Sequence, residues 1–403
     1  MELSMIEENK GRIFTATHHG NILGYVAIDS TIRGHSCGGL RMLPDIDEAE
    51  IRALARSMTL KYGFLGLPQG GAKAGVLGNP EAPKSERLER LVKFGHAIEP
   101  LLRTKAFIPT SDMGTQNSDI RHMLHAVGMH LTRRDLRNNS SGYYTGLSVL
   151  AGVVQSARHL GLDLSRCTAA IEGFGNVGRP LTSLLASAGI KVIAVSTSRG
   201  ALYNPRGLDV SHLIQLSDEA GSRVVEHYHD AELIDPEKLL ELSVDILCPC
   251  ARWNSLNASN VDRIAVKVIC PGANNPITPE AENVLFERGV LCLPDFVTNC
   301  GGVLGGTMEF ASVTREKITT FINHHIGVRI AWLLNEAKSK RLLPREVAVP
   351  FALHRFNRVA QSAERPTPLS RLFNLGLECY RQGWIPGPFV APLSLKYFKK
   401  LLT

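Results

Sequence analysis

Apolar and polar residues alternate with a period of two near the start of the chain and then change to helical spacing. Residues 12–29 alternate around a His-His-Gly-Asn turn, which predicts a β-hairpin. Residues 45–64 begin with acidic residues and carry apolar residues at helical spacing, which predicts a helix. A second amphipathic helix is predicted over 85–102, and a short strand that ends in a loop over 106–115.

From about residue 145 the pattern changes to short apolar runs separated by helical stretches. A helix over 145–161 is followed by a strand, a glycine turn and a helix over 168–189. Further strands are predicted at 190–196, 244–250, 266–272 and 290–295. Strands that alternate with helices predict a parallel, doubly wound sheet, and the chain is helical again after about 320. With 403 residues, 44% of them hydrophobic, we expect an α/β protein of two domains.

Composition excludes several classes of protein. The first residues lack a basic and apolar signal, and the apolar runs are too short or too broken to span a membrane, so we expect a cytoplasmic protein. The eight cysteines are scattered in apolar surroundings, which favours reduced thiols, and Cys248 and Cys250 lack a second pair at zinc spacing, so no metal is expected. The net charge of +7 favours anionic ligands, but the basic residues are not interleaved with aromatics as in nucleic-acid binders. The Pro-rich, basic C-terminus is expected to pack on the surface; a short amphipathic membrane anchor is the alternative.

The segment Ile-Glu-Gly-Phe-Gly-Asn-Val-Gly carries Gly173, Gly175 and Gly178 in the G-x-G-x-x-G spacing. A predicted strand precedes it and a helix follows, which is the context of a dinucleotide-binding turn. The first glycine makes the turn, the second lets the backbone approach a pyrophosphate, and the third lets the helix pack against the strand. The pyrophosphate then lies at the helix N-terminus, where N–H groups are unpaired.

The next strand carries no acidic residue where one would bind the ribose hydroxyls of NAD. Thr197, Ser198 and Arg199 stand there, and hydroxyls with a guanidinium suit a 2′-phosphate. The cofactor is therefore expected to be NAD or NADP, with the residues favouring NADP; the alternative is a loop that discriminates neither.

Two lysines, Lys61 and Lys73, lie in a nearly uncharged, Gly-rich stretch. Most lysines are exposed, but this setting predicts that both are buried beside an anion such as a substrate. Lys61 can bind an α-carboxylate, and Lys73 can act as a base because burial lowers the pKa of a lysine. Asp112, on a loop after a strand, can exchange protons with the reacting nitrogen, although an Asp that caps a turn is the common alternative.

These motifs together resemble the glutamate/leucine/phenylalanine/valine dehydrogenase family. The resemblance rests on segments in family order at 38–42, 58–76, 109–115, 145–146, 171–178, 200–209, 271–281 and 294–303. The early hairpin and short N-terminus are more similar to the leucine dehydrogenase branch. The resemblance implies a substrate domain, which also serves oligomerisation, from residues 1–141 plus 323–403, and a Rossmann-type nucleotide domain from 142–322, with a cleft at their junction. It also implies a homo-oligomer.

The resemblance also implies roles for individual residues. Lys61 would hold the α-carboxylate, Lys73 would activate water, and Asp112 would shuttle protons. Further substrate-binding positions are Gly39, Leu40, Thr110, Asn299 and Gly306. Further cofactor-binding positions are Thr145, Asn176, Val177, Ala251 and Asn274.

Two departures from the family pattern bear on the substrate. Glutamate-specific members carry a lysine where this chain has Cys37 and a serine where it has Gly306. A buried carboxylate without a partner costs several kcal/mol, and Gly305 and Gly306 are expected to leave volume. Gln69 and Thr110 add polar groups. We therefore expect an NAD(P)-dependent dehydrogenase of apolar or aromatic L-amino acids; the alternatives are a glutamate dehydrogenase and a non-catalytic nucleotide-binding regulator.

Overall fold

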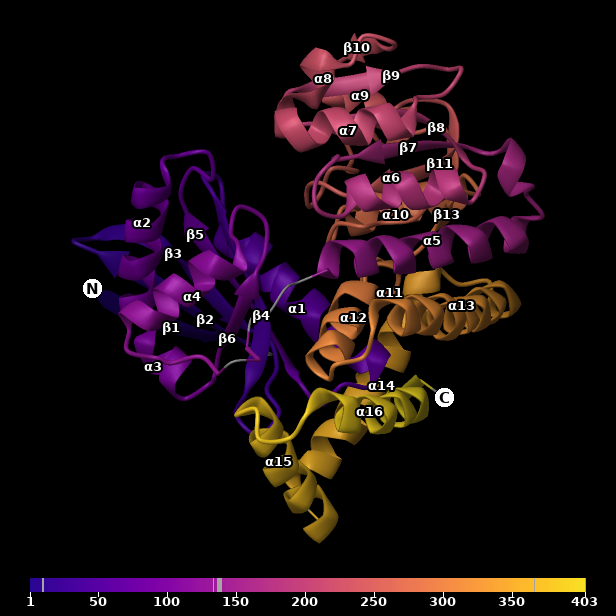
Figure 1. Cartoon of the computed structure of the whole chain (residues 1–403). Coiled ribbons are helices and arrows are strands. Elements are labelled where there is room, and N and C mark those ends of the chain that lie inside the picture. The colour runs from indigo at the N-terminus through magenta and orange to yellow at the C-terminus, as the bar shows by residue number, and fades with distance from the viewer. Residues whose placement is uncertain (9–10, 133, 136–139, 366, 403) are drawn as a thin grey trace. The chain divides into compact units, whose positions relative to one another are not determined.

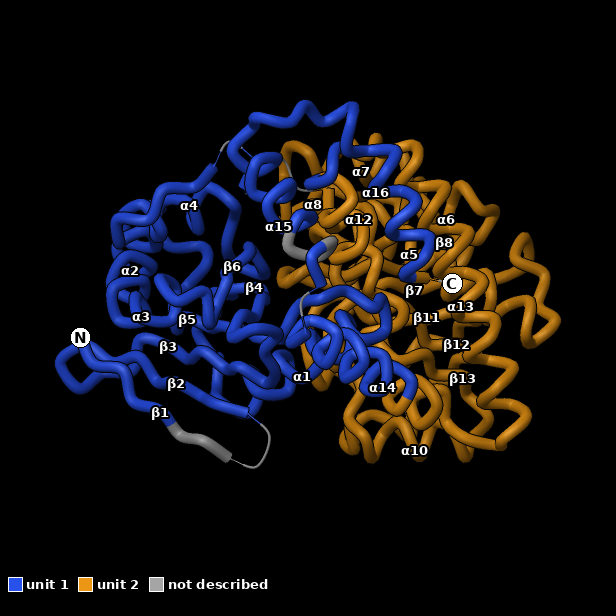
Figure 2. The backbone as a smooth tube through the Cα atoms, turned by 90° about the horizontal axis from the view of Figure 1, so that it is seen from below, with its two compact units in different colours: residues 1–139, 310–312, 351–401 blue, residues 140–309, 313–350, 402–403 orange. Residues whose placement is uncertain are grey.

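The chain folds into two compact units, coloured separately in Figure 2. The structure, a computed structural model, describes residues 1–8, 11–132, 134–135, 140–365 and 367–402. Unit 1 consists of residues 1–139, 310–312 and 351–401, and unit 2 of residues 140–309, 313–350 and 402–403. The predicted α/β class and two-domain organisation are present.

Unit 1 is built on a six-stranded sheet in the order β1-β2-β3-β5-β4-β6. Its strands are β1 (Glu2–Glu8), β2 (Gly11–His18), β3 (Asn21–Ile28), β4 (Ser36–Leu43), β5 (Gly70–Leu77) and β6 (Ile108–Ser111). β2 and β3 form the predicted hairpin, with His19 and Gly20 at positive φ in its turn. β4 runs parallel to both β5 and β6, so the ends of these three strands meet at one edge of the sheet.

The two faces of this sheet have different neighbours. Ala72, Ala74 and Val76 of β5 belong to a buried core that also contains residues of α2 (Lys84–Ala97) and α4 (Asn117–Ala126). The alternate residues face α1 (Glu48–Leu65), since a Cβ added at Gly71 would lie 2.3 Å from the backbone nitrogen of Thr59. The side chain of Lys73 therefore points to the α1 face.

The predicted helix over 85–102 is in fact two helices. α2 ends at Ala97, and α3 (Glu99–Arg103) starts anew after Ile98. Pro100 has no N–H to continue the ladder of α2, but it fits the first turn of α3.

Unit 2 contains the doubly wound sheet, in the order β10-β9-β8-β7-β11-β12-β13. Its strands are β7 (Thr168–Glu172), β8 (Lys191–Thr197), β9 (Gly200–Tyr203), β10 (Glu232–Ile234), β11 (Val244–Pro249), β12 (Val266–Ile269) and β13 (Leu291–Cys292). β7 pairs in parallel with β8 on one side and β11 on the other. The strand order thus reverses at β7, which is where dinucleotides bind in such sheets.

Helices surround this second sheet (Figure 1). They are α5 (Ser141–Leu160), α6 (Gly178–Ser187), α7 (Val210–Ala220), α8 (Val224–His227), α9 (Pro236–Leu240), α10 (Pro279–Glu287), α11 (Asp295–Thr298), α12 (Gly301–Phe310) and α13 (Arg315–Lys340). α13 packs against α5, close enough that a Cβ at Gly327 would contact Gln155. The sequence prediction assigned residues from 323 onward to the first domain, whereas this packing places the whole of α13 in unit 2.

The last three helices are α14 (Pro344–Glu364), α15 (Pro368–Arg381) and α16 (Gly387–Leu402). The Pro-rich C-terminus is therefore mostly helical. Among the residues that the structure describes, none of the helices combines the length and apolarity needed to cross a membrane.

Candidate active site

Three predicted site residues lie side by side across the sheet of unit 1. Gly39 on β4 pairs with Thr110 on β6, and the register of β4 with β5 places Lys73 at the same level on the other side of Gly39. Cys37 lies two residues earlier on β4, opposite Gly71. Since paired residues in a sheet share a face, these positions all face α1.

Lys73 is buried and forms an ion pair with the Oδ2 of Asp112, which follows β6. The Nε of Arg41 lies 3.2 Å from the same oxygen, and Arg41 also pairs with the buried Glu50 of α1. The structure thus brings the two predicted catalytic residues into direct contact and adds two charged groups that the sequence analysis had not assigned. Two cations and two carboxylates balance each other in this buried cluster.

Glycines allow this close approach. A Cβ at Gly39 would lie 2.8 Å from the Cβ of Asp112, and a Cβ at Gly38 would lie 1.6 Å from the carbonyl oxygen of Ala72. The loop after β6 is fixed by Thr115, whose hydroxyl donates to the carbonyl of Leu40 at 2.7 Å and accepts from the N–H of Asp112 at 3.0 Å. The carboxylate of Asp112 is therefore held at the strand edge.

The environment shifts the pKa values of both groups. Burial lowers the pKa of Lys73, and the charge of Asp112 only partly offsets this. Burial alone raises the pKa of Asp112, but the charges of Lys73 and Arg41 outweigh it and hold that pKa well below its ordinary value. A lysine with a lowered pKa beside an ionised carboxylate is suited to general acid–base chemistry.

Lys61 is buried on α1, the helix that covers the face to which Lys73 points. The nearby side-chain positions are weakly polar. Cys37 is a neutral thiol whose pKa is raised by burial, and the Nε2 of Gln69 is buried without a hydrogen-bond partner among the described residues. Leu40 itself points away into the core formed with α2 and α4, so only its backbone can face the site.

The predicted dinucleotide turn follows β7 in unit 2. Gly173 has a φ of +91° and donates its N–H to the Oγ of Ser196 at 3.0 Å. A Cβ at Gly178 would lie 1.8 Å from the carbonyl oxygen of Gly173, whereas a Cβ at Gly175 would meet nothing within 4 Å. The third glycine thus packs α6 against the turn, and the second leaves open space, as a pyrophosphate at the helix N-terminus requires. These residues fit a dinucleotide.

Other predicted cofactor residues lie in the same unit. Ala251 touches the Gly173 position, and Asn176 and Val177 lie within the turn. Thr145, on α5, donates its hydroxyl to the carbonyl of Ser141 at 2.8 Å. The side-chain oxygen of Asn274 accepts a hydrogen bond of 2.8 Å from Asn299, whose own Oδ1 is buried without a partner among the described residues.

β8 ends at Thr197, whose Oγ1 accepts the N–H of Arg199 at 3.1 Å. Ser198 and Arg199 are exposed in the turn to β9. No carboxylate belongs to this turn.

The last residue of β7, Glu172, is a buried carboxyl group directly before the glycine turn. It accepts a hydrogen bond of 3.0 Å from the hydroxyl of Ser255. Burial raises the pKa of Glu172 to about 7, although Ser255 and the charge of Arg252 act in the opposite direction. The sequence analysis did not identify this residue.

Gly305 and Gly306 differ in the structure. A Cβ at Gly305 would lie 2.3 Å from the ring of Tyr144, so this position is filled and the predicted volume there was wrong. A Cβ at Gly306 would meet nothing within 4 Å. Of these two glycines, Gly306 is therefore the one that leaves space for a side chain.

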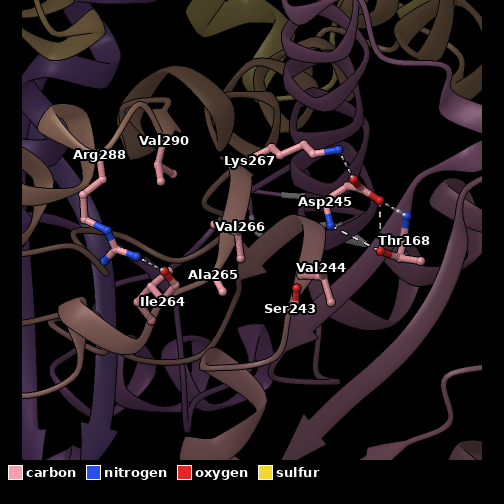
Figure 3. Close-up of a pocket in the computed structure, with 10 residues that line it drawn as sticks. All are labelled: Thr168, Ser243, Val244, Asp245, Ile264, Ala265, Val266, Lys267, Arg288 and Val290. Carbon is pink, nitrogen blue, oxygen red and sulfur yellow. Dashed lines mark hydrogen bonds and ion pairs between the residues drawn. The ribbon is translucent and has the colours of Figure 1, made fainter.

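A pocket of about 400 Å³ lies in unit 2, at the end of its sheet where the parallel strands start (Figure 3). It is lined by residues at the starts of the parallel strands, including Thr168, Asp245 and Lys267. The Nζ of Lys267 lies 2.8 Å from the Oδ1 of Asp245. The Oδ2 of Asp245 accepts a hydrogen bond of 2.8 Å from the backbone N–H of Thr168. Since the glycine turn follows the other end of β7, this pocket is separate from the dinucleotide turn.

Comparison with protein families gives two matches. Residues 139–362 match the glutamate/leucine/phenylalanine/valine dehydrogenase family, and residues 12–129 match the dimerisation domain of Glu/Leu/Phe/Val dehydrogenases. The chain belongs to this family. It is therefore an amino-acid dehydrogenase, an oxidoreductase, and the dehydrogenases of this family use NAD(P). The match to a dimerisation domain supports an oligomer.

Individual relatives include two glutamate dehydrogenases. The enzyme of Thermotoga maritima is 38% identical over 305 residues, which cover 71% of this chain and 72% of the relative. The NAD-specific glutamate dehydrogenase of Staphylococcus aureus is 33% identical over 304 residues, with the same coverage.

Solved structures share the fold of this dehydrogenase. The hetero-hexameric glutamate dehydrogenase of Thermus thermophilus, in a Leu-bound form, has a TM-score of 0.72 at 24% identity and covers 88% of each chain. The L-tryptophan dehydrogenase of Nostoc punctiforme has a TM-score of 0.57 at 22% identity, covering 89% of this chain and 96% of that one. At these identities the likeness shows the fold alone.

The candidate active site includes residues that sequence reasoning did not assign. Arg41 could have been found, because the alternation of Cys37, Gly39 and Arg41 along one strand places all three on one face. Thr115 and Glu50 gave no such signal, since their partners lie on other elements.

Proposed function

We propose that this dehydrogenase oxidatively deaminates an apolar or aromatic L-amino acid to the 2-oxo acid and ammonia, or runs the reverse reductive amination. The observation that carries the proposal is the buried pair of Lys73 and Asp112 in unit 1. A non-catalytic nucleotide-binding regulator has no need of a buried, charge-compensated lysine and carboxylate.

Lys61, Lys73 and Asp112 have separate roles in the proposed reaction. Lys61 binds the α-carboxylate as a buried cation. Oxidation of the amino acid to an imine needs a hydride acceptor at the α-carbon, which is the chemistry that NAD(P) would supply when bound. Lys73 in its neutral form takes a proton from the water that attacks the imine carbon, and Asp112 passes protons to and from the nitrogen. The lowered pKa of Lys73 supports this role, because a base must be unprotonated at working pH.

Glycine residues and nearby backbone N–H groups would hold the cofactor. Gly173, Gly175 and Gly178 would hold the pyrophosphate at the start of α6, and Thr145, Asn274 and Ala251 would lie along the rest of the dinucleotide. We propose NADP as the preferred form, because Thr197, Ser198 and Arg199 offer hydroxyls and a guanidinium and no carboxylate.

The preference for an apolar substrate side chain follows from the lack of a cation for a second substrate carboxylate. Cys37 supplies no cation, and Arg41 is already engaged by Asp112 and Glu50, so a second substrate carboxylate finds no free cation among these groups. A buried, unpaired carboxylate costs several kcal/mol, whereas an apolar side chain gains about 25 cal/mol per Å² of apolar area buried. The open space at Gly306 suits a large side chain.

The test is an absorbance assay of nicotinamide reduction with each L-amino acid and both cofactors. We expect kcat/KM for leucine or phenylalanine to exceed that for alanine by at least about tenfold, or ~1.4 kcal/mol, and phenylalanine or tryptophan to match valine. Gly306→Val should shift the preference to smaller branched substrates. Glutamate as the best substrate would contradict the proposal and point to Gln69 or Thr110 as its partner.

A matched pair of variants isolates the charge at the side-chain position. Cys37→Lys should raise kcat/KM for glutamate relative to leucine, whereas Cys37→Ala should leave the ratio near that of the wild type. Equal ratios in both variants would show that Cys37 does not face the substrate side chain.

A further inference from the structure

Glu172 lies where the dinucleotide crevice of unit 2 begins. It is the last residue of β7, which pairs with β11 in the middle of the sheet (Figure 1). The strand order reverses at β7, and dinucleotides bind in the crevice beyond the carboxyl ends of such strands. The N–H of Cys250, directly after β11, donates to the carbonyl of Glu172 at 2.7 Å and holds the two strand ends together. Glu172 is therefore at the base of the crevice.

The side chain of Glu172 points to the segment that follows β11. A Cβ at the first residue of α6 would lie 3.2 Å from the side chain of Ile171, so Ile171 faces α6 and Glu172 faces the other side of the sheet. There the Oε2 of Glu172 accepts a hydrogen bond of 3.0 Å from the hydroxyl of Ser255. Ala251, in the same segment, lies against Gly173 of the dinucleotide turn. The carboxyl group is thus next to both the glycine turn and the segment after β11.

A negative charge on this carboxyl group has little compensation. Glu172 is buried, and the hydroxyl of Ser255 is the only partner of its carboxyl group among the residues described. The charged and titratable groups nearby are Arg252, whose charge favours the ionised form, and Cys250, whose thiol stays neutral because burial raises its pKa. Burial has the largest effect and raises the pKa of Glu172 to about 7, so the neutral and ionised forms are both populated near neutral pH.

The pyrophosphate of a bound dinucleotide would add negative charge close to Glu172. It would approach the backbone at Gly175, three residues after Glu172. Three residues of chain span at most about 11 Å. Two like charges on the order of 10 Å apart, at an effective dielectric constant of about 20, change an equilibrium constant by about tenfold. An ionised Glu172 therefore opposes dinucleotide binding, whereas a neutral Glu172 does not.

We infer that Glu172 sets the affinity for the dinucleotide through its charge: the cofactor binds the form with a neutral carboxyl group, and binding is accompanied by uptake of a proton. The pyrophosphate is common to NAD and NADP, so the inference holds for both. It concerns cofactor binding alone and does not depend on which amino acid is the substrate, so it can fail or succeed separately from the proposed function.

The experiment titrates the full chain with NADH by isothermal calorimetry between pH 6 and pH 8. NADH is the probe because its two phosphates keep their charge over this range, whereas a 2′-phosphate titrates near pH 6. We expect the Kd of the wild type to rise by about fivefold from pH 6 to pH 8, as for a carboxyl group whose pKa rises from about 7 to about 8 on binding. Glu172→Gln should keep its low-pH Kd at pH 8. The control Glu237→Gln, at an exposed position in the same unit, should behave as the wild type.

Proton uptake is measured by repeating the titration at pH 7 in buffers of different ionisation enthalpy. The wild type should take up roughly 0.4 of a proton per site more than Glu172→Gln. Ser255→Ala removes a hydrogen bond that favours the ionised form, so it should raise the pKa of Glu172 and move the rise in Kd to higher pH. Equal pH dependence and equal proton uptake in the wild type and Glu172→Gln would overturn the inference. Weaker binding by Glu172→Gln, by the same factor at pH 6 and pH 8, would also overturn it, because the role of Glu172 would then be structural.

Discussion

Glu172→Gln tests how strongly the end of β7 is desolvated. The carboxyl group is buried before the glycine turn and has a pKa of about 7, compared with an ordinary value of 4.5. Between these two values the folded state keeps the proton while the unfolded chain has released it. The free energy of unfolding therefore falls as pH rises from about 4.5 to about 7, and is constant above that range.

The size of the effect follows from the shift. Each pKa unit corresponds to ~1.4 kcal/mol, so ionisation of Glu172 lowers the stability at pH 8 by on the order of 3 kcal/mol. Glutamine has nearly the same shape, its carbonyl can accept the hydrogen bond of Ser255, and it does not ionise. The variant should therefore equal the wild type at or below about pH 4.5 and exceed it increasingly up to pH 7.

The assay is urea unfolding at several pH values between 4.5 and 8, at one fixed protein concentration. Glu237→Gln, at an exposed position in the same unit, is the control and should show no pH-dependent difference from the wild type. A difference between Glu172→Gln and the wild type that does not change with pH would refute the reasoning, as would a variant that is less stable at pH 8.

The remaining predictions concern the proposed chemistry. Lys73→Met and Asp112→Asn should each lower kcat by about 100-fold or more, because general acid–base groups contribute that much; cofactor titration should show unchanged binding, and near-normal turnover of either variant would remove its residue from the mechanism. Gly39→Ala should lower kcat by about tenfold or more, because the new methyl group displaces the Asp112 carboxylate; an unchanged kcat would mean that the carboxylate need not be held there. Lys61→Ala should raise KM by a similar factor for every amino acid, and a loss confined to one substrate would indicate a side-chain contact instead. Thr197→Asp should shift the ratio of kcat/KM toward NAD, because a carboxylate accepts from the ribose hydroxyls and repels a 2′-phosphate; a wild type that already prefers NAD strongly would contradict our interpretation of this turn.

Local signals in the sequence were enough for the main elements and for the buried lysines. The nearly uncharged, Gly-rich stretch around Lys61 and Lys73 predicted burial, and both are buried. The glycine spacing after a strand predicted the turn at Gly173, because Gly173 has a positive φ and Gly178 has no room for a Cβ.

Features that depend on distant residues were not predictable in this way. Gly305 suggested open volume, but the ring of Tyr144, from a helix far earlier in the chain, fills it. The ordinary-looking Glu172 acquires its raised pKa only from the burial that the sheet imposes. The division between units depended on how α13 packs against α5, which its own composition does not specify.

Most of unit 2 lies between the two main segments of unit 1 in the chain, so the ribosome makes the two parts of unit 1 at different times. Unit 1 begins with the first residue and is completed only by the segment from Phe351 onward, so its N-terminal sheet leaves the ribosome well before its last helices exist. Most of unit 2, by contrast, is one continuous stretch that can fold as soon as it emerges. Lys61 and Lys73 are therefore translated before unit 2 but belong to a unit whose last helices are made after most of unit 2, so a chain released early would carry the Lys73–Asp112 pair on an incomplete support.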